Sequence, residues 1–202
     1  MVSLQRRAAV PFLAGLIRRA TRLGVACLML VSVTGLAAHA DQTDPRLDAL
    51  FERLQEVGDA INARATEEKI WTIWLEVRDP TVDMLLTTGI DRMNRGDYRG
   101  ALDSFDAVVE AAPDFAEGWN KRATVHYLLN NLEESLADIE ETLSREPRHF
   151  GALSGRGLVH IKRNDLESAL TAFEAALVVH PQMTGARINA RSIKKILKQR
   201  EI

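Results

Sequence analysis

The chain has 202 residues, with 26 lysines and arginines against 28 aspartates and glutamates, and its one cysteine is Cys27. This length allows one ordinary domain or a short array of repeats. A single cysteine excludes an internal disulfide framework and a metal site built from several thiolates.

The first 40 residues differ in composition from the rest of the chain. They contain five arginines and no acidic residue, followed by an apolar stretch at 23–37 and the sequence Ala38-His39-Ala40. This order predicts a secretory signal peptide over residues 1–40 that is cut after Ala40. The apolar stretch is shorter than the ~20 residues that span a bilayer, which favours cleavage over a retained anchor.

Three other interpretations of this leader stay open. Arginine pairs also occur in twin-arginine signals, but neither pair here is closely followed by a hydrophobic pair. Cys27 could serve lipid attachment, although Gly24 stands where such sites use a leucine-like residue. Arginine-rich leaders without acidic residues also address mitochondria. We predict a periplasmic or secreted mature protein, with a mitochondrial location as the alternative.

Without residues 1–40 the chain keeps 21 basic residues against 28 acidic ones, a net charge of −7. Contacts with phosphates need clustered lysines and arginines, so we expect no nucleic-acid partner. The mature part contains no cysteine, so packing has to supply its stability.

Residues 41–81 have the pattern of two short helices, each with an apolar stripe, separated by Gly58 and Asp59. The stripes are Leu47, Leu50, Phe51 and Leu54, then Ile70, Trp71, Ile73, Trp74 and Val77. We predict a helical hairpin that serves as a degenerate first repeat or a cap. Its tryptophans are expected to pack on the repeat that follows, and the alternative is an exposed aromatic patch for a partner.

Pro113, Pro147 and Pro181 are spaced at 34 residues, the length of one helix–turn–helix repeat. With Val82 as the first position, several positions of the unit keep one class of residue in every copy. The three units are 82–115, 116–149 and 150–183. The fourth position is large and apolar, the eighth and twentieth are small, the twenty-fourth is large and apolar, and the thirty-second is proline. The fourth position is Leu85, Trp119 and Leu153, and the eighth is Gly89, Ala123 and Gly157. The twentieth is Ala101, Ser135 and Ala169, and the twenty-fourth is Phe105, Ile139 and Phe173.

This pattern resembles the tetratricopeptide repeat family, and the resemblance covers residues 82–183. It implies an all-α fold, a right-handed α-solenoid of helix–turn–helix repeats with the N-terminal hairpin before it and a capping helix after it. Small residues let the two helices of a unit cross closely, and the proline ends the second helix. The helices are expected at 81–95, 98–112, 116–129, 132–145, 150–163 and 166–179. The expected turn residues and helix caps are Gly96, Asn130 and Asn164, followed by Asp97, Asn131 and Asp165. Trp119 is expected to be a buried core residue.

Residues 184–202 predict a single capping helix. Its apolar stripe is Ala186, Ala190, Ile193 and Leu197, and most of the remaining surface is basic. We interpret the basic surface as the solvated face that a terminal repeat needs, with contact to anionic lipid or an acidic partner as the alternative. We expect no other membrane contact apart from an uncleaved leader.

In the tetratricopeptide repeat family the first helices of the units line a groove that takes peptides or helices of partner proteins. The resemblance implies a partner-binding groove made of Leu86, Ile90, Met93, Asn120, Thr124, Tyr127, Ser154, Leu158 and Ile161. The family's best-known groove clamps a C-terminal carboxylate with Lys and Asn, where this chain has Leu86 and Ile90. We therefore expect a semi-apolar groove for a hydrophobic segment or an amphipathic helix. The alternative is that the chain's own hairpin or a second copy fills the groove.

The sequence contains no recognisable catalytic constellation, phosphate-binding glycine loop or metal motif. We predict no catalytic residue, no cofactor and no metal, and we interpret His126 and His160 as packing residues. The predicted function is a non-catalytic protein–protein interaction scaffold of the cell envelope, which leaves the partner's identity open. The alternative is a periplasmic folding or assembly factor that holds unfolded segments.

Overall fold

The structure is a computed structural model that describes residues 42–200. Within this range it contains nine α-helices and no strand, in agreement with the predicted all-α fold. The helices are α1 (Arg46–Glu56), α2 (Ala60–Trp74), α3 (Pro80–Asn94), α4 (Tyr98–Ala111), α5 (Ala116–Leu128), α6 (Leu132–Arg145), α7 (Phe150–Lys162), α8 (Leu166–Val179) and α9 (Thr184–Arg200). The predicted signal peptide lies outside the described residues. None of the helices within them is both long enough and apolar enough to span a membrane.

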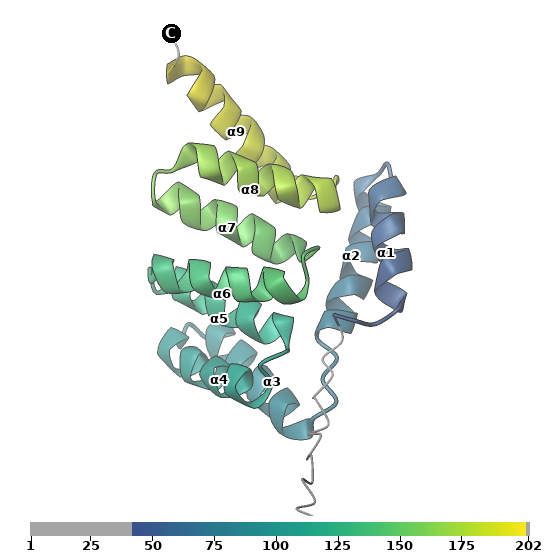
Figure 1. The fold of residues 1–202 in the computed structure, drawn as a ribbon, viewed down its shortest axis with the longest axis vertical. Coiled ribbons are helices and arrows are strands. Elements are labelled where there is room, and N and C mark those ends of the chain that lie inside the picture. The colour runs from purple at the N-terminus through teal and green to yellow at the C-terminus, as the bar shows by residue number, and fades with distance from the viewer. Residues whose placement is uncertain (1–41, 201–202) are drawn as a thin grey trace, which may run out of the picture. The chain divides into compact units, whose positions relative to one another are not determined.

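Helices α3 to α9 pack in chain order (Figure 1). The most extensive contacts are within the pairs α3/α4, α5/α6 and α7/α8, and α9 packs on α8. The ends of α3 to α8 lie within one residue of the predicted ends. The 34-residue period therefore corresponds to one helix pair per unit.

Each pair is joined by a residue in the left-handed region, as predicted: Gly96, Asn130 and Asn164 have φ values of 78°, 65° and 58°. Asp97 and Asp165 then cap the second helix by accepting a hydrogen bond from a backbone N–H three residues later. The prediction was wrong for Asn131, whose side chain makes no cap. Its side-chain amide nitrogen lies 3.4 Å from Nδ1 of His126 instead.

Aromatic rings cover the glycines where the paired helices cross. The ring of Phe173 lies so close to Gly157 that a Cβ there would stand 2.7 Å from a ring carbon, and Phe105 covers Gly89 in the same way. Both phenylalanines are fully buried. In the first and third units position eight is glycine because the position-twenty-four ring of the same unit occupies the space of its side chain.

We expect Gly157→Ala to lower the free energy of unfolding by about 1–3 kcal/mol, because the added methyl overpacks the crossing. Gly155 on the same helix provides a matched control, since its Cβ would meet its nearest neighbour at an ordinary 3.8 Å. Gly155→Ala should raise stability by up to about 1 kcal/mol through helix propensity. Urea unfolding of both variants checks this. Equal stability of the two would contradict the described crossing, whereas partial recovery in Gly157→Ala/Phe173→Leu would support it.

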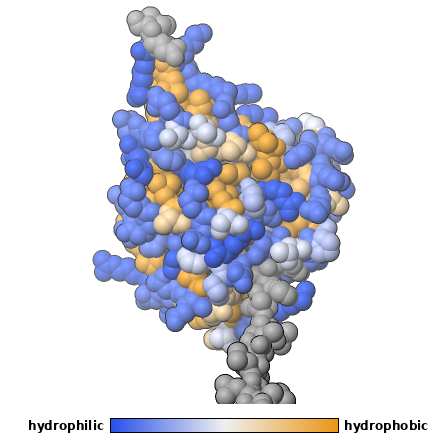
Figure 2. All heavy atoms as spheres, viewed as in Figure 1, coloured by the Kyte–Doolittle hydropathy of each residue, from blue (hydrophilic) through white to orange (hydrophobic). Residues whose placement is uncertain are grey.

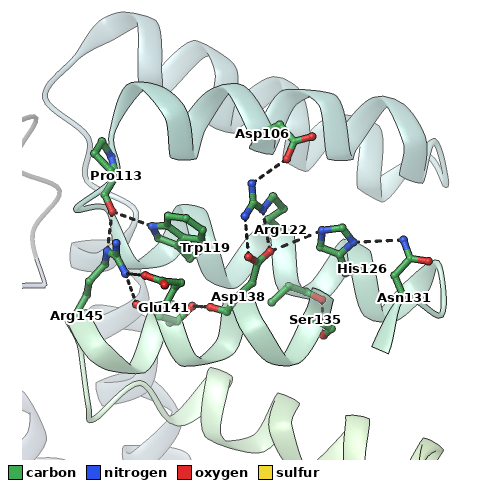
Figure 3. Close-up of polar contacts among 12 residues, drawn as sticks. Asp106, Pro113, Trp119, Arg122, His126, Asn131, Ser135, Asp138, Glu141 and Arg145 are labelled. Atoms are coloured by element: carbon green, nitrogen blue, oxygen red, sulfur yellow. Dashed lines mark hydrogen bonds and ion pairs between the residues drawn. The ribbon is translucent and has the colours of Figure 1, made fainter. Parts of the chain in front are cut away.

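Trp119 is only partly buried, which corrects its predicted place in the core. Figure 3 shows this α5 side chain between α4 and α6, where its Nε1 donates a 2.8 Å hydrogen bond to the Pro113 carbonyl. The guanidinium groups of Arg122 and Arg145 lie 4.8 and 4.9 Å from its ring centre. Arg145 donates to the same carbonyl, and Arg122 pairs with the buried Asp138. Trp119 therefore fixes the α4–α5 turn at the surface, with arginines as its packing partners.

The N-terminal hairpin does not stack on the first repeat, which corrects a second prediction. Its apolar faces form one buried cluster with Phe150 at the start of α7, and Val179 and Met183 pack against that cluster. Trp71 and Trp74 lie 5.4 and 5.1 Å from Phe150, measured between ring centres. Figure 1 shows α1 and α2 beside the stack rather than within it.

The linker between α2 and α3 makes this placement possible. Leu75 and Val77 in this linker pack against the core of the α3/α4 pair, so the linker covers the first repeat in place of the tryptophans. Polar contacts then hold the hairpin to distant parts of the chain. Arg148 lies 2.7 Å from Asp48, and Glu67 lies 3.2 Å from His180 at the end of α8.

Candidate partner-binding groove

A cavity of about 190 Å³ opens between α5 and α7. Five of the predicted groove residues line it: Asn120, Thr124, Tyr127, Ser154 and Leu158. The remaining lining residues are Ala123, Ser135, Ile139, Gly151, Ala152, Gly155 and Met183. All the predicted groove residues of the second repeat and two of the third thus lie at one cavity.

Short side chains on the facing helices leave this cavity open. The α7 face contributes Gly151 and Gly155, and the α5 face contributes Ala123 and Thr124. Lys162 of α7 fixes the rim, because its Nζ donates to the backbone carbonyl of Tyr127 and lies 3.9 Å from the centre of the tyrosine ring.

Three polar side chains of the lining are already hydrogen-bonded within the protein, and the hydroxyls of Tyr127 and Ser154 are the other polar groups at the cavity. Ser135 Oγ donates to the Ala123 carbonyl at 2.8 Å, and Thr124 Oγ1 donates to the Asn120 carbonyl at 2.9 Å. The Asn120 amide donates to Glu117, also at 2.9 Å. Because these groups are satisfied, the cavity offers mainly apolar contact and suits a partner's hydrophobic side chain.

The other four predicted groove residues lie outside the cavity lining. Leu86 is 2% exposed and belongs to the same buried cluster as Val125 of α5, so its assignment to an open groove was wrong. Ile90 and Met93 are half-buried against that cluster. Ile161 packs instead against the α8/α9 core. In the first repeat, Leu86, Ile90 and Met93 therefore serve packing.

The hairpin bounds one end of the cavity without filling it. Gly151 lines the cavity and also lies against Trp71, whose ring a Cβ at this position would approach to 2.8 Å. Met183 likewise lines the cavity and packs against the hairpin cluster. No hairpin residue lines the cavity itself. The hairpin therefore borders the groove and does not occupy it, which corrects the alternative in which the hairpin fills the groove.

A buried charge network connects the groove to the hairpin. The Glu117 carboxylate is 2% exposed and lies 2.7 Å from Nζ of Lys121 and 2.9 Å from Nε2 of His149. Nδ1 of His149 accepts a hydrogen bond from the Ala152 N–H, so the ring proton is on Nε2 and is donated to Glu117. The imidazole stacks on Trp74 of the hairpin with 4.1 Å between ring centres.

Burial raises the pKa of Glu117, but the charge of Lys121 and the hydrogen bond from His149 outweigh it. The pKa of Glu117 therefore lies below its ordinary value. Sequence reasoning did not single out this network. The only local signal was the spacing of Glu117 and Lys121, which places a carboxylate and an ammonium one helical turn apart. The position of His149, one unit further along the chain, becomes evident only once the repeats stack.

Comparison with known proteins gives the same repeat family as the geometry of the helix pairs. The tetratricopeptide repeat model matches residues 86–143 and 129–184. A TPR repeat-containing protein of Rhizobium etli is 37% identical over 110 residues, which are 54% of this chain and 54% of that protein. The match thus spans about half the length of this relative.

Two solved structures share the fold. One is the first TPR of Spaghetti (RPAP3) bound to HSP90 peptide SRMEEVD, with a TM-score of 0.57 and 22% identity over 58% of this chain and 94% of that one. The other is the Sgt2 TPR domain from Aspergillus fumigatus, with a TM-score of 0.58 and 21% identity over 61% of this chain and 83% of that one. The described helices thus form an α-solenoid of helix–turn–helix repeats. The chain is a tetratricopeptide repeat protein.

Proposed function

We propose that the protein is a non-catalytic interaction module that binds a hydrophobic segment or an amphipathic helix of a partner between α5 and α7. The observation that carries this proposal is the 190 Å³ cavity with a mainly apolar lining. A peptide complex of the structurally similar RPAP3 domain agrees with such a role. This chain has Leu86 and Ile90 where a carboxylate clamp has polar residues, and the predicted partner segment is therefore apolar rather than a C-terminal carboxylate.

The proposal is tested by selecting peptides from a random library on the purified chain and measuring their affinity by fluorescence anisotropy. We expect the selected peptides to share a large apolar residue that fits the cavity. Thr124→Glu should weaken their binding about tenfold or more, because a charge at the cavity mouth opposes apolar burial.

Thr171→Glu is the matched control. Thr171 is also an exposed helical threonine whose hydroxyl donates to the carbonyl four residues before it, but it lies outside this cavity. Unchanged binding by this variant, with equal melting temperatures for both, would assign the effect to the cavity. Equal weakening in both variants would remove the cavity as the site. Tight binding of peptides with no residue in common would instead favour a folding or assembly factor.

We further propose that this module acts as a scaffold in the cell envelope, on the basis of the basic and apolar pattern of residues 1–40. Fractionation of cells that express the tagged chain, with mass determination of the product, tests the location. A mature product that begins at Asp41 and separates from cytosolic markers is expected. A full-length cytosolic product or a mitochondrial product would refute the location and leave the groove proposal intact.

A further inference from the structure

The charge of the mature chain is unevenly distributed. Residues 41–183 contain 15 basic and 27 acidic residues, a net charge of −12. Residues 184–200 contain six basic residues and no acidic one. The protein therefore has an acidic body and one cationic helix, α9, at the C-terminal end of the repeats.

The cations of α9 gather on one face of the helix. A different side of the helix buries Ala186, Ala190 and Ile193 against the α8 core. The cations recur at intervals of three or four residues, which places them along one line on the helix. This basic stripe consists of Arg187, Arg191, Lys194, Lys195 and Lys198. All of them except the half-buried Arg187 are exposed.

Neighbouring groups neutralise only part of this stripe. Lys194 lies 2.7 Å from Glu174 of α8, and Arg187 donates a 3.4 Å hydrogen bond to the Gln182 carbonyl. Within residues 42–200, Arg191, Lys195 and Lys198 form no ion pair. Their charges are therefore free to attract an external anionic group.

An apolar residue accompanies the stripe. Ile188 is 59% exposed and lies one and two turns before Arg191 and Lys195 on the same side of the helix. In Figure 2, α9 at the top of the view shows hydrophilic residues on both sides of a hydrophobic strip. A uniformly acidic surface would satisfy the cations but offer Ile188 no apolar contact. A lipid surface provides anionic headgroups and an apolar boundary together.

We propose that the basic stripe of α9 docks the protein on an anionic phospholipid surface. The helix presents its cations over about 17 Å, which matches a planar array of headgroups better than a single anion. The same surface repels the acidic body, so the protein would stand with α9 against the lipid. Since most of the apolar side of α9 is packed on α8, attraction of charges carries the binding.

The test uses cosedimentation of the purified chain with vesicles of phosphatidylcholine alone and with vesicles containing about one third phosphatidylglycerol. We expect binding only to the anionic vesicles, and we expect its loss when salt rises from about 0.1 M to about 1 M. Arg191→Gln/Lys195→Gln/Lys198→Gln should weaken binding on the order of 100-fold, because each cation near such a surface changes the affinity about fivefold.

Arg64→Gln/Arg95→Gln/Arg163→Gln is the matched control, since it removes the same charge from exposed arginines outside α9. It should bind almost as well as the wild type. Equal loss in the two triple variants would overturn the assignment to α9, and so would binding to phosphatidylcholine alone. Binding to soluble polyglutamate without binding to the vesicles would identify an acidic polypeptide as the ligand and would also overturn the proposal. Peptide binding in the groove is measured separately by Thr124→Glu, so the two proposals can fail independently.

Discussion

Replacing Trp74 with alanine should lower the free energy of unfolding by about 3–5 kcal/mol, because a large buried aromatic is lost at the contact between the hairpin and the repeats. Trp74 is 2% exposed. Its ring stacks on His149 at an interplanar angle of 7° and lies 5.9 Å from Phe51 of α1. The tryptophan thus joins both hairpin helices to the start of α7. Urea unfolding measures the loss, and limited proteolysis should show faster cleavage in the linker 75–79.

Trp119→Ala is the control for this substitution. It removes the same side chain from a site that is partly exposed and bordered by arginines. Its expected cost is smaller, since less apolar surface is lost from the interior. A Trp74 variant that is as stable as the Trp119 variant, with an uncleaved linker, would contradict the described docking of the hairpin.

Lys121→Met should have a comparably large effect, a loss of about 3–5 kcal/mol near neutral pH. The substitution leaves the buried Glu117 carboxylate without its cation, and it also removes the ammonium group that lies 5.4 Å from the centre of the Trp71 ring. The hydrogen bonds from His149 and Asn120 remain, but they do not supply a compensating positive charge.

The pH dependence of this loss distinguishes the charge effect from a packing effect. In the wild type the pKa of Glu117 in the folded state is below the ordinary 4.5, so its stabilising contribution is complete above about pH 4.5 and is lost as the pH falls through the folded pKa. Without Lys121, burial dominates and the folded pKa rises above the unfolded one. The deficit of the variant should therefore shrink on acidification.

Chemical unfolding of both proteins between about pH 4 and pH 8 tests this sign. Glu117→Gln/Lys121→Met is the matched variant, since it removes both charges and should recover most of the stability with little dependence on pH. A deficit that grows as the pH falls would show that Lys121 acts through its packing and not through its charge on Glu117.

The repeats could be predicted from sequence because their determinants are local and recur. Each determinant acts within one unit. The prolines end helices, the left-handed residues Gly96, Asn130 and Asn164 form the turns, and the small residues permit the helix crossings. Three copies in register then locate every helix of the stack. Five of the predicted groove residues were found at one cavity for the same reason, since their positions follow from the repeat alone.

The remaining features depend on contacts that the repeat pattern does not contain. The docking of the hairpin requires Trp71 and Trp74 to meet His149 and Phe150, which share no motif with them. Leu86 packs in the buried cluster of the first repeat, whereas Asn120, at the same position of the second unit, lines the cavity. Trp119 occupies a core position in the repeat pattern, but arginines and the Pro113 carbonyl hold it near the surface.

The hairpin docks on a part of the chain that is distant in sequence, and this has a consequence for the order in which the chain folds. Asp48 meets Arg148 across 100 residues of sequence, and Glu67 meets His180 across 113. During synthesis the hairpin emerges before the repeats, yet its contact surface exists only after the third repeat has followed. We therefore expect its two tryptophans to stay uncovered while each repeat closes by short-range contacts, and we expect closure of this long loop to be the slow final step. Once made, it ties an early segment to a late one, so an array that would otherwise fray unit by unit loses its structure as a whole.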